Sequence, residues 1–213
     1  MNRPIGIFGG TFDPVHFGHL RPALEVCKQL NLEQVRLIPS KVPVHRAQPV
    51  APLEQRILWL QQVTEAVPQF VVDLREVERE TPSWMVVTLE SLKKEFPDHP
   101  LVLILGMDAF LQLESWHRWQ ALLDSAHLLV THRPGFVRPE RGIFSDWLLQ
   151  RETEQITLLH QRVEKGEGKV LFLSVTQLEI SASGIRSQIV AGGTPLFLLP
   201  DIIHNSVIDC YST

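Results

Sequence analysis

The sequence has few cysteines and no segment that suggests a membrane span. Its 213 residues include only Cys27 and Cys210. Two cysteines in a chain large enough to bury a sizeable core argue against a disulfide framework and indicate a reducing compartment. The longest apolar runs, such as Leu101–Gly106, fall far short of the roughly 18 residues of a membrane helix. The N-terminus also lacks the apolar stretch of a secretory signal, so we expect a cytoplasmic protein with no membrane partner.

An excess of positive charge is also lacking. The chain has 20 Lys and Arg residues against 24 Asp and Glu residues, a net charge of −4. A general nucleic-acid or membrane-surface binder should be basic, so we expect no nucleic-acid partner. The hydrophobic share of 44% and charged share of 21% are ordinary for a globular protein. The length suits a single domain over residues 1–213. Nothing in the sequence decides between a monomer and a homo-oligomer.

Short β-rich apolar runs alternate with longer amphipathic stretches along the chain. The expected strands are Ile5–Phe8, Gln34–Pro39, Gln69–Asp73, Leu101–Gly106, His127–His132 and Val170–Ser174. Helical stretches such as Leu53–Val67 and Trp84–Phe96 lie between them. This alternation predicts an α/β fold, a Rossmann-like doubly wound parallel sheet with flanking helices. Such sheets bind ligands at the carboxyl ends of the strands, where the strand order reverses.

Two segments leave carboxyl ends of expected strands as loops. Ser40–Pro52 contains three prolines and cannot form a regular helix. Arg133–Gly142 is basic in an otherwise acidic protein. Both are either solvated surface loops or parts of a site at that edge of the sheet.

The stretch "FGGTFDPVHFGHL" follows the first expected strand, which ends near Phe8. Gly9 and Gly10 permit backbone angles with φ > 0 and the close approach of a ligand. Pro14 is a poor interior residue, so we expect a helix to begin near His16, with its body over Phe17–Leu30. On that helix, His16 and His19 continue the apolar face at its first turn. Gly18, between them, leaves room for something bulky.

Three interpretations of the paired histidines remain. They are core residues bonded to the backbone, zinc ligands, or donors to a phosphate at a helix N-terminus. Two buried imidazoles without a partner would be desolvated without compensation, which favours the phosphate. For zinc, no third ligand is obvious nearby. The chain has no G-x-x-x-x-G-K-[ST] motif and no G-x-G-x-x-G after its first strand, so other common phosphate motifs do not apply.

A second candidate phosphate site is "EISASGIRSQIV", Glu179–Val190, in a C-terminal helical subregion at about 175–213. Ser183 is the expected N-cap of a helix, which would put Arg186 in the first turn. A cation there opposes the helix dipole. An anion that bridges Arg186, the serine hydroxyls and the helix N–H groups would explain why a cation lies at this position. The alternative is that Arg186 is an exposed surface residue.

Together the two stretches resemble the nucleotidylyltransferase superfamily. "GGTFDPVHFGH" resembles its G-G-x-F-D-P-x-H-x-G-H signature, and "ISASGIR" resembles its I-S-x-[ST]-x-[IV]-R motif. Four further segments are similar to those of bacterial nicotinate-nucleotide adenylyltransferases: "VPVHR" (Val42–Arg46), "PSWMVVTL" (Pro82–Leu89), "GMDAFLQLESW" (Gly106–Trp116) and "AHLLVTHRPGF" (Ala126–Phe136). The resemblance covers nearly the whole chain. The sequence departs from the family's pattern at Val44, Trp84 and Met85.

The resemblance implies an enzyme of NAD biosynthesis that transfers AMP from ATP to nicotinate mononucleotide, giving deamido-NAD and pyrophosphate. It implies Mg²⁺ held mainly by phosphates, with no direct protein ligands. The implied catalytic residues are His16, His19 and Arg186. The implied ATP-binding residues are Gly9, Gly10, Thr11, Phe12, Gly18, Gly106, Asp108, Ser181 and Ser183. The implied mononucleotide-binding residues are His45, Arg46, Ser83, Met85, Trp116, His117 and Arg133. Alternatives are nicotinamide mononucleotide or phosphopantetheine as the acceptor, or an ATP-binding sensor without chemistry.

Overall fold

The structure is a computed structural model that describes residues 2–41, 48–132, 143–176 and 178–212. Six parallel strands form one sheet in the order β3-β2-β1-β4-β5-β6. The strands are β1 (Ile5–Gly10), β2 (Gln34–Pro39), β3 (Phe70–Val72), β4 (Leu101–Gly106), β5 (His127–His132) and β6 (Val170–Ser174). The expected doubly wound α/β fold is confirmed. Two boundaries differ, because β1 continues to Gly10 and β3 is shorter than expected.

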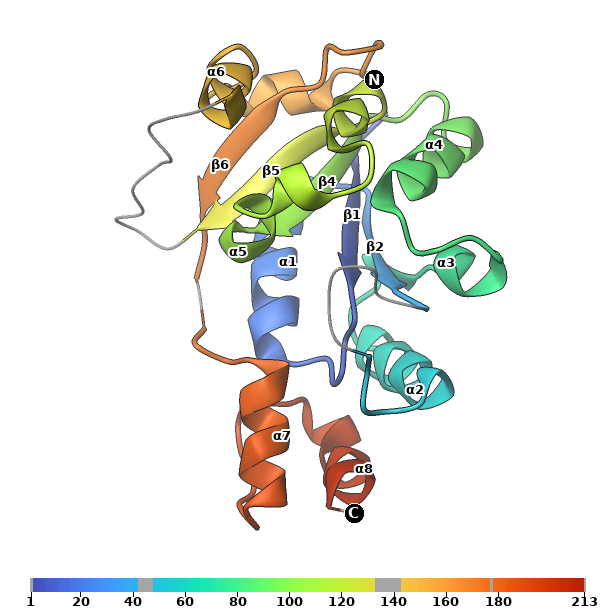
Figure 1. The fold of residues 1–213 in the computed structure, drawn as a ribbon, viewed down its shortest axis with the longest axis vertical. Helices are drawn as coiled ribbons and strands as arrows, with labels where there is room; N and C mark the ends of the chain where they lie inside the picture. Colours follow the sequence, from blue (N-terminus) through green and yellow to red (C-terminus); the bar gives the residue numbers. More distant parts are fainter. Residues whose placement is uncertain (1, 42–47, 133–142, 177, 213) are drawn as a thin grey trace.

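Helices connect the strands and cover the sheet (Figure 1). The α-helices are α1 (Phe17–Gln29), α2 (Leu53–Thr64), α3 (Arg75–Glu78), α4 (Met85–Glu95), α5 (Met107–Phe110), α6 (Ile143–Leu149), α7 (Ala182–Val190) and α8 (Asp201–Tyr211). The 3-10 turns are η1 (Leu113–Ser115), η2 (Trp119–Asp124) and η3 (Ile156–His160). Among the described residues, no helix is long and apolar enough to cross a membrane. Cys27 and Cys210 are free thiols.

The sheet is buried on both faces, which explains its continuous apolar strands. Along β4, Ile104 belongs to the core on the α1 face, whereas Leu103 and Leu105 belong to the core on the α4 face. Successive strand residues point to opposite faces, so one apolar run serves both cores. The α1-face core also includes side chains from α2, α7 and α8.

The strand order reverses between β1 and β4, and this switch point positions the site. The chain leaves β1 toward α1 and leaves β4 toward α5, so the two connections diverge and leave space between them. Helices α7 and α8 lie together beyond the carboxyl end of β1, at the opposite end of the molecule from the N-terminus (Figure 1). The second candidate phosphate motif therefore lies near the first.

Candidate active site

A cleft of about 1110 Å³ opens at the carboxyl ends of the strands around the switch point. Its lining comes mainly from the connections that follow β1, β4 and β6 and from the N-terminus of α4, with further residues from α3, β5 and the segment after β2. Every expected site residue in the described part of the chain lines it. These residues are Gly9, Gly10, Thr11, Phe12, His16, Gly18, His19, Ser83, Met85, Gly106, Asp108, Trp116, His117, Ser181, Ser183 and Arg186. The remaining three, His45, Arg46 and Arg133, lie outside the described residues.

The glycine pair after β1 differs from expectation in its backbone. Gly9 and Gly10 still pair with β2, so neither has a positive φ; the left-handed conformation falls on Phe12, with φ of 50°. The close approach that the structure shows at Gly9 is that of another part of the protein. A Cβ there would lie 2.5 Å from Cε of Met85, so the missing side chain lets α4 pack against the turn.

The two histidines lie at the start of α1, as predicted. His16 is the N-cap residue, and its ring stacks on that of His19 with centroids 3.7 Å apart. Burial lowers the pKa of His16 to about 4, so its imidazole is neutral at pH 7. The backbone N–H of His16 donates to Nδ1 of His19 at 3.4 Å, which leaves Nε2 of a neutral His19 as the protonated nitrogen. Within the described residues, Nδ1 of His16 has no hydrogen-bond partner.

The space beside Gly18 is taken by the protein itself. A Cβ on Gly18 would lie 2.8 Å from Nδ1 of His16 and 2.9 Å from the carbonyl oxygen of Ile180. The expectation that this glycine leaves room for a bulky group is therefore wrong. Its missing side chain instead lets the histidine ring and the segment before α7 come together, which joins the two candidate phosphate motifs.

The second motif is capped differently from the sequence prediction. Ser181 is the N-cap of α7, since its backbone is extended and its Oγ accepts a hydrogen bond from the N–H of Gly184 at 3.1 Å. Ser183 lies inside the helix, so the prediction that it caps the helix is wrong. Arg186 consequently lies in the second turn, where the dipole penalty is weaker than expected. Its Nη1 donates to the backbone oxygen of Asp13 at 2.5 Å.

The opposite side of the cleft is aromatic. Trp84 stacks on the imidazole of His117, with centroids 4.2 Å apart and planes 24° apart. Trp116 lines the cleft beside them. Arg79 donates to the carbonyl oxygens of Pro82 and Trp84 at 3.2 Å, which fixes the segment before α4. This side offers flat apolar surfaces to a planar ring.

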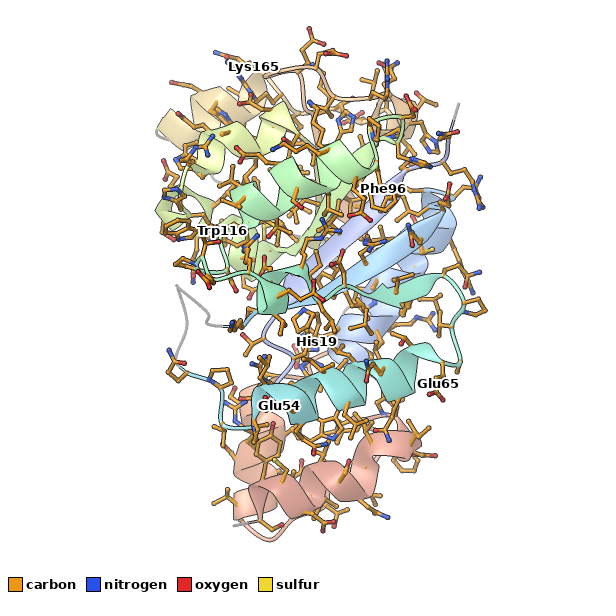
Figure 2. All side chains as sticks on the ribbon, turned by 90° about the vertical axis from the view of Figure 1, so that its right-hand side faces the viewer. His19, Glu54, Glu65, Phe96, Trp116 and Lys165 are labelled. Atoms are coloured by element: carbon orange, nitrogen blue, oxygen red, sulfur yellow. The ribbon has the colours of Figure 1, made fainter. Side chains whose placement is uncertain are left out.

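His19 and Trp116 both line the cleft and come from different parts of the molecule. In Figure 2, His19 lies between the sheet and the helices at the C-terminal end, whereas Trp116 lies toward an outer edge of the molecule. A ligand that reaches both would therefore have a polar, phosphate-like part and a flat ring part.

Sequence reasoning missed a buried arginine that supports the cleft. Arg56 is 1% exposed and donates to the carbonyl oxygens of Thr11 and Ser40 at 2.7 and 3.0 Å. It thereby ties the turn after β1 to the segment after β2. The helical spacing could have indicated that Arg56 is buried, because it shares one face of α2 with the buried Trp59 and Leu60.

Sequence reasoning also missed a buried carboxyl group. Glu76 lines the cleft at 3% exposure, and burial raises its pKa. The hydroxyl of Thr88 donates to it at 2.6 Å, and Arg79 lies 3.5 Å away. No local motif marks this residue, since α3 is a single short turn in a charged stretch.

The metal question depends on the same side chains. The described residues contain no group of three or more His, Cys, Asp or Glu residues placed to hold a metal ion. The zinc interpretation of His16 and His19 therefore finds no third ligand in this part of the chain. Phosphate binding remains the interpretation that uses the buried imidazoles, the helix starts and Arg186 together.

Comparison with known proteins agrees with this chemistry. Residues 7–188 match the cytidylyltransferase-like family model. A relative from Aeromonas hydrophila, described as a probable nicotinate-nucleotide adenylyltransferase, is 44% identical over 200 residues, 94% of this chain and 92% of the relative. A relative from Hydrogenovibrio crunogenus with the same description is 44% identical over 210 residues, 98% of this chain and 96% of the relative.

A solved structure shares the fold. The nicotinic acid mononucleotide adenylyltransferase of Plasmodium falciparum, complexed with NaAD, matches with a TM-score of 0.67 over 98% of this chain and 94% of that one, at 16% identity. The family match spans both candidate phosphate motifs, and the curated relatives align along almost the entire chain. The chain therefore belongs to the cytidylyltransferase-like family and, within it, to the nicotinate-nucleotide adenylyltransferases.

Proposed function

We propose that this protein transfers the adenylyl group of ATP to nicotinate mononucleotide, forming nicotinate adenine dinucleotide and releasing pyrophosphate. One observation carries the proposal. His16 and His19 at the start of α1 line the same cleft as the aromatic group around Trp116, and so do Ser181, Ser183 and Arg186 at the start of α7. Phosphate donors and a ring-binding surface are what a reaction between ATP and a pyridine mononucleotide requires. The relatives' descriptions name the same activity.

In this reaction a phosphate oxygen of the mononucleotide attacks the α-phosphorus of ATP in line. A new P–O bond forms, the bond between the α-phosphorus and the bridging oxygen breaks, and pyrophosphate leaves with the electron pair. No protein nucleophile is needed, so the enzyme acts by positioning and charge stabilisation. His16 and His19 are proposed to donate to the α-phosphate and the bridging oxygen, and Arg186 to the β- and γ-phosphates.

The other residues are assigned to substrate binding. For ATP, the turn Gly9–Phe12, Gly18, Gly106, Asp108, Ser181 and Ser183 are proposed. Trp116 is proposed to stack on the pyridine ring, with the amides of Ser83, Met85 and His117 receiving the carboxylate. The Trp84–His117 stack supports this, because it fixes the orientation of the segment that would carry one of those amides. His45, Arg46 and Arg133 complete the proposed mononucleotide site.

A divalent cation, proposed to be Mg²⁺, fits a cleft of this kind. The lining offers donors for phosphates rather than a grouped set of metal ligands in the described residues. Phosphate oxygens and water would therefore supply most of its coordination. When bound, it would neutralise charge on the triphosphate.

A cytoplasmic setting belongs to the same proposal, because both thiols are free and the substrates are phosphorylated metabolites.

A parallel assay tests the proposal. Pyrophosphate release from ATP would be measured with nicotinate mononucleotide, nicotinamide mononucleotide or phosphopantetheine, each with Mg²⁺ and with excess chelator. We expect the highest kcat/KM with nicotinate mononucleotide and turnover only with the metal. A higher kcat/KM with another acceptor would overturn the substrate assignment. ATP binding without turnover on any acceptor would favour the sensor alternative.

A further inference from the structure

Asp13 lies at the centre of a hydrogen-bond network that the proposed chemistry does not use. Its side chain is 4% exposed. Its carboxylate accepts from the backbone N–H groups of Val50 and Ala51, each at 2.9 Å, and from the hydroxyl of Tyr211 at 2.7 Å. Nη1 of Arg186 lies 3.3 Å from the same carboxylate. The network thus joins four parts of the chain that are distant in sequence.

The donors are divided between the two carboxylate oxygens. Oδ1 accepts from Tyr211 and Ala51, whereas Oδ2 accepts from Val50 and lies beside Arg186. A carboxylate has about four lone-pair sites. Three of them accept these hydrogen bonds, and the Arg186 guanidinium faces Oδ2 as an ion pair. Donors on both oxygens also fix the plane of the group. Removal of the Tyr211 hydroxyl would leave Oδ1 with the Ala51 N–H as its one donor and weaken the restraint on the orientation of the carboxylate.

Arg186 contacts Asp13 in two ways. The same Nη1 that faces the Asp13 carboxylate also donates to the backbone oxygen of Asp13 at 2.5 Å. A guanidinium has five N–H donors, so these contacts leave others to bind a phosphate. The position of Arg186 in the cleft is therefore set by the residue that it contacts at the end of the first motif.

Tyr211 is placed to act from outside the cleft. It is the single tyrosine of the chain, lies at the end of α8 and is 4% exposed. Its ring packs near that of Trp59, with centroids 5.9 Å apart. Burial, followed by the bond to Asp13, raises the pKa of Tyr211 well above its ordinary value. The hydroxyl is therefore protonated and able to donate at neutral pH.

We propose that Tyr211 is a positioning residue of the ATP site, whose hydroxyl fixes the Asp13 carboxylate and, through it, Arg186. The C-terminal helix α8 is then part of the site although it does not line the cleft. The proposal rests on the function proposed above, because Arg186 is taken to hold the β- and γ-phosphates.

The same helix offers a matched control. Ser206 also carries a hydroxyl beside Trp59, since its Oγ accepts from Nε1 of that tryptophan at 2.9 Å and donates to the carbonyl oxygen of Ile203. Tyr211→Phe and Ser206→Ala each remove one hydroxyl of α8 that is hydrogen-bonded in the interior. Only Tyr211→Phe removes a bond to Asp13.

The experiment measures ATP and AMP affinity by titration calorimetry without an acceptor, together with the Tm of each variant. We expect Tyr211→Phe to weaken ATP binding about threefold to tenfold, the range of one lost hydrogen bond. AMP lacks the β- and γ-phosphates, so its affinity should change less than about twofold. Ser206→Ala should lower the Tm by a similar amount and leave ATP affinity within about twofold.

Two results would overturn the positioning role. One is ATP affinity in Tyr211→Phe equal to that of the wild type; the other is an equal loss of ATP affinity in Ser206→Ala, which would indicate general destabilisation. Failure of the proposed function is distinguishable, because the wild-type protein would then fail to bind ATP or to turn over any acceptor. A wild type that binds ATP and turns over normally, with an unaffected Tyr211→Phe, contradicts the positioning role alone.

Discussion

At the scale of single residues, the stacked histidines at the start of α1 are the groups to which we assign the largest part in catalysis. His16 and His19 lie with their ring centroids 3.7 Å apart, and both line the cleft. Each is proposed to donate to charge that develops on the phosphates. Removing one such preorganised donor typically costs a factor of 10²–10³ in kcat.

We therefore expect His16→Ala and His19→Ala each to lower kcat by about 10²–10³. Steady-state pyrophosphate release with saturating ATP and nicotinate mononucleotide measures this. His160→Ala, from η3 outside the cleft lining, is the matched control and should retain the wild-type kcat. Near-normal turnover in both single variants would contradict the catalytic assignment.

The buried His16 also makes stability depend on pH. Its folded-state pKa of about 4 lies below the ordinary 6.5, so the unfolded chain binds the proton more tightly. The stability of the folded protein with a neutral, buried His16 is fully present above pH 6.5. It is lost as the pH falls from 6.5 toward 4, because the unfolded chain then takes up the proton first. At pH 5 this residue should lower the free energy of unfolding by about 2 kcal/mol relative to pH 7.

Urea denaturation at pH 7 and pH 5 measures this loss. His127 is also buried with a lowered pKa, so the wild-type value includes more than one histidine. Comparison with His16→Gln isolates the contribution of His16, and the drop between the two pH values should be smaller in that variant. An equal drop in both proteins would show that His16 is not buried and neutral.

At the scale of elements, α7 depends on a cap that the sequence pattern misassigned. Both Ser181 and Ser183 precede apolar residues, so either could begin the helix. The structure selects Ser181, because its backbone is extended and its hydroxyl accepts the N–H of Gly184. Which serine caps the helix follows from where the segment after β6 turns, and that is a tertiary feature.

The two serines give a paired test. Ser181→Ala should lower the free energy of unfolding by about 1 kcal/mol, the typical cost of losing an N-cap. Ser183→Ala, two residues later inside the same helix, should change it by less than about 0.5 kcal/mol. Urea denaturation at pH 7 measures both. A larger loss of unfolding free energy in Ser183→Ala than in Ser181→Ala would show that Ser183 is the N-cap.

At the scale of the whole molecule, the C-terminal helices share the core of the sheet. Ile185 and Ile189 of α7 and Ile203 and Val207 of α8 belong to the same buried cluster as Val26 of α1. A subregion that shares its core with the sheet should not unfold independently. This favours a single domain over residues 1–213 rather than a separable C-terminal unit.

We therefore expect one calorimetric unfolding transition, with equal calorimetric and van't Hoff enthalpies. Ile203→Ala, at a position with 0% exposure, should lower the stability of the whole molecule by about 2–5 kcal/mol without splitting that transition. Differential scanning calorimetry tests both statements. If a second transition appeared, and Ile203→Ala lowered the temperature of that transition only, the chain would consist of two independently unfolding units.

The sequence by itself determined the α/β fold class, most strand boundaries and many of the residues that line the cleft. Those features follow from local patterns: apolar runs of strand length, a helix that begins after Pro14, and two motifs of high specificity. The position of His16 on the buried face was predictable for the same reason, because helical periodicity fixes which residues share a face.

Only the tertiary structure decided how the two motifs meet. The pairing of Gly9 and Gly10 with β2, the contact of Gly18 with the segment before α7, and the bonds from Arg56 and Tyr211 all join residues far apart in the chain. No local pattern encodes such contacts, because they depend on which elements the strand order brings together. The reversal between β1 and β4 and the return of α7 and α8 to the β1 end therefore placed Asp13 beside Tyr211.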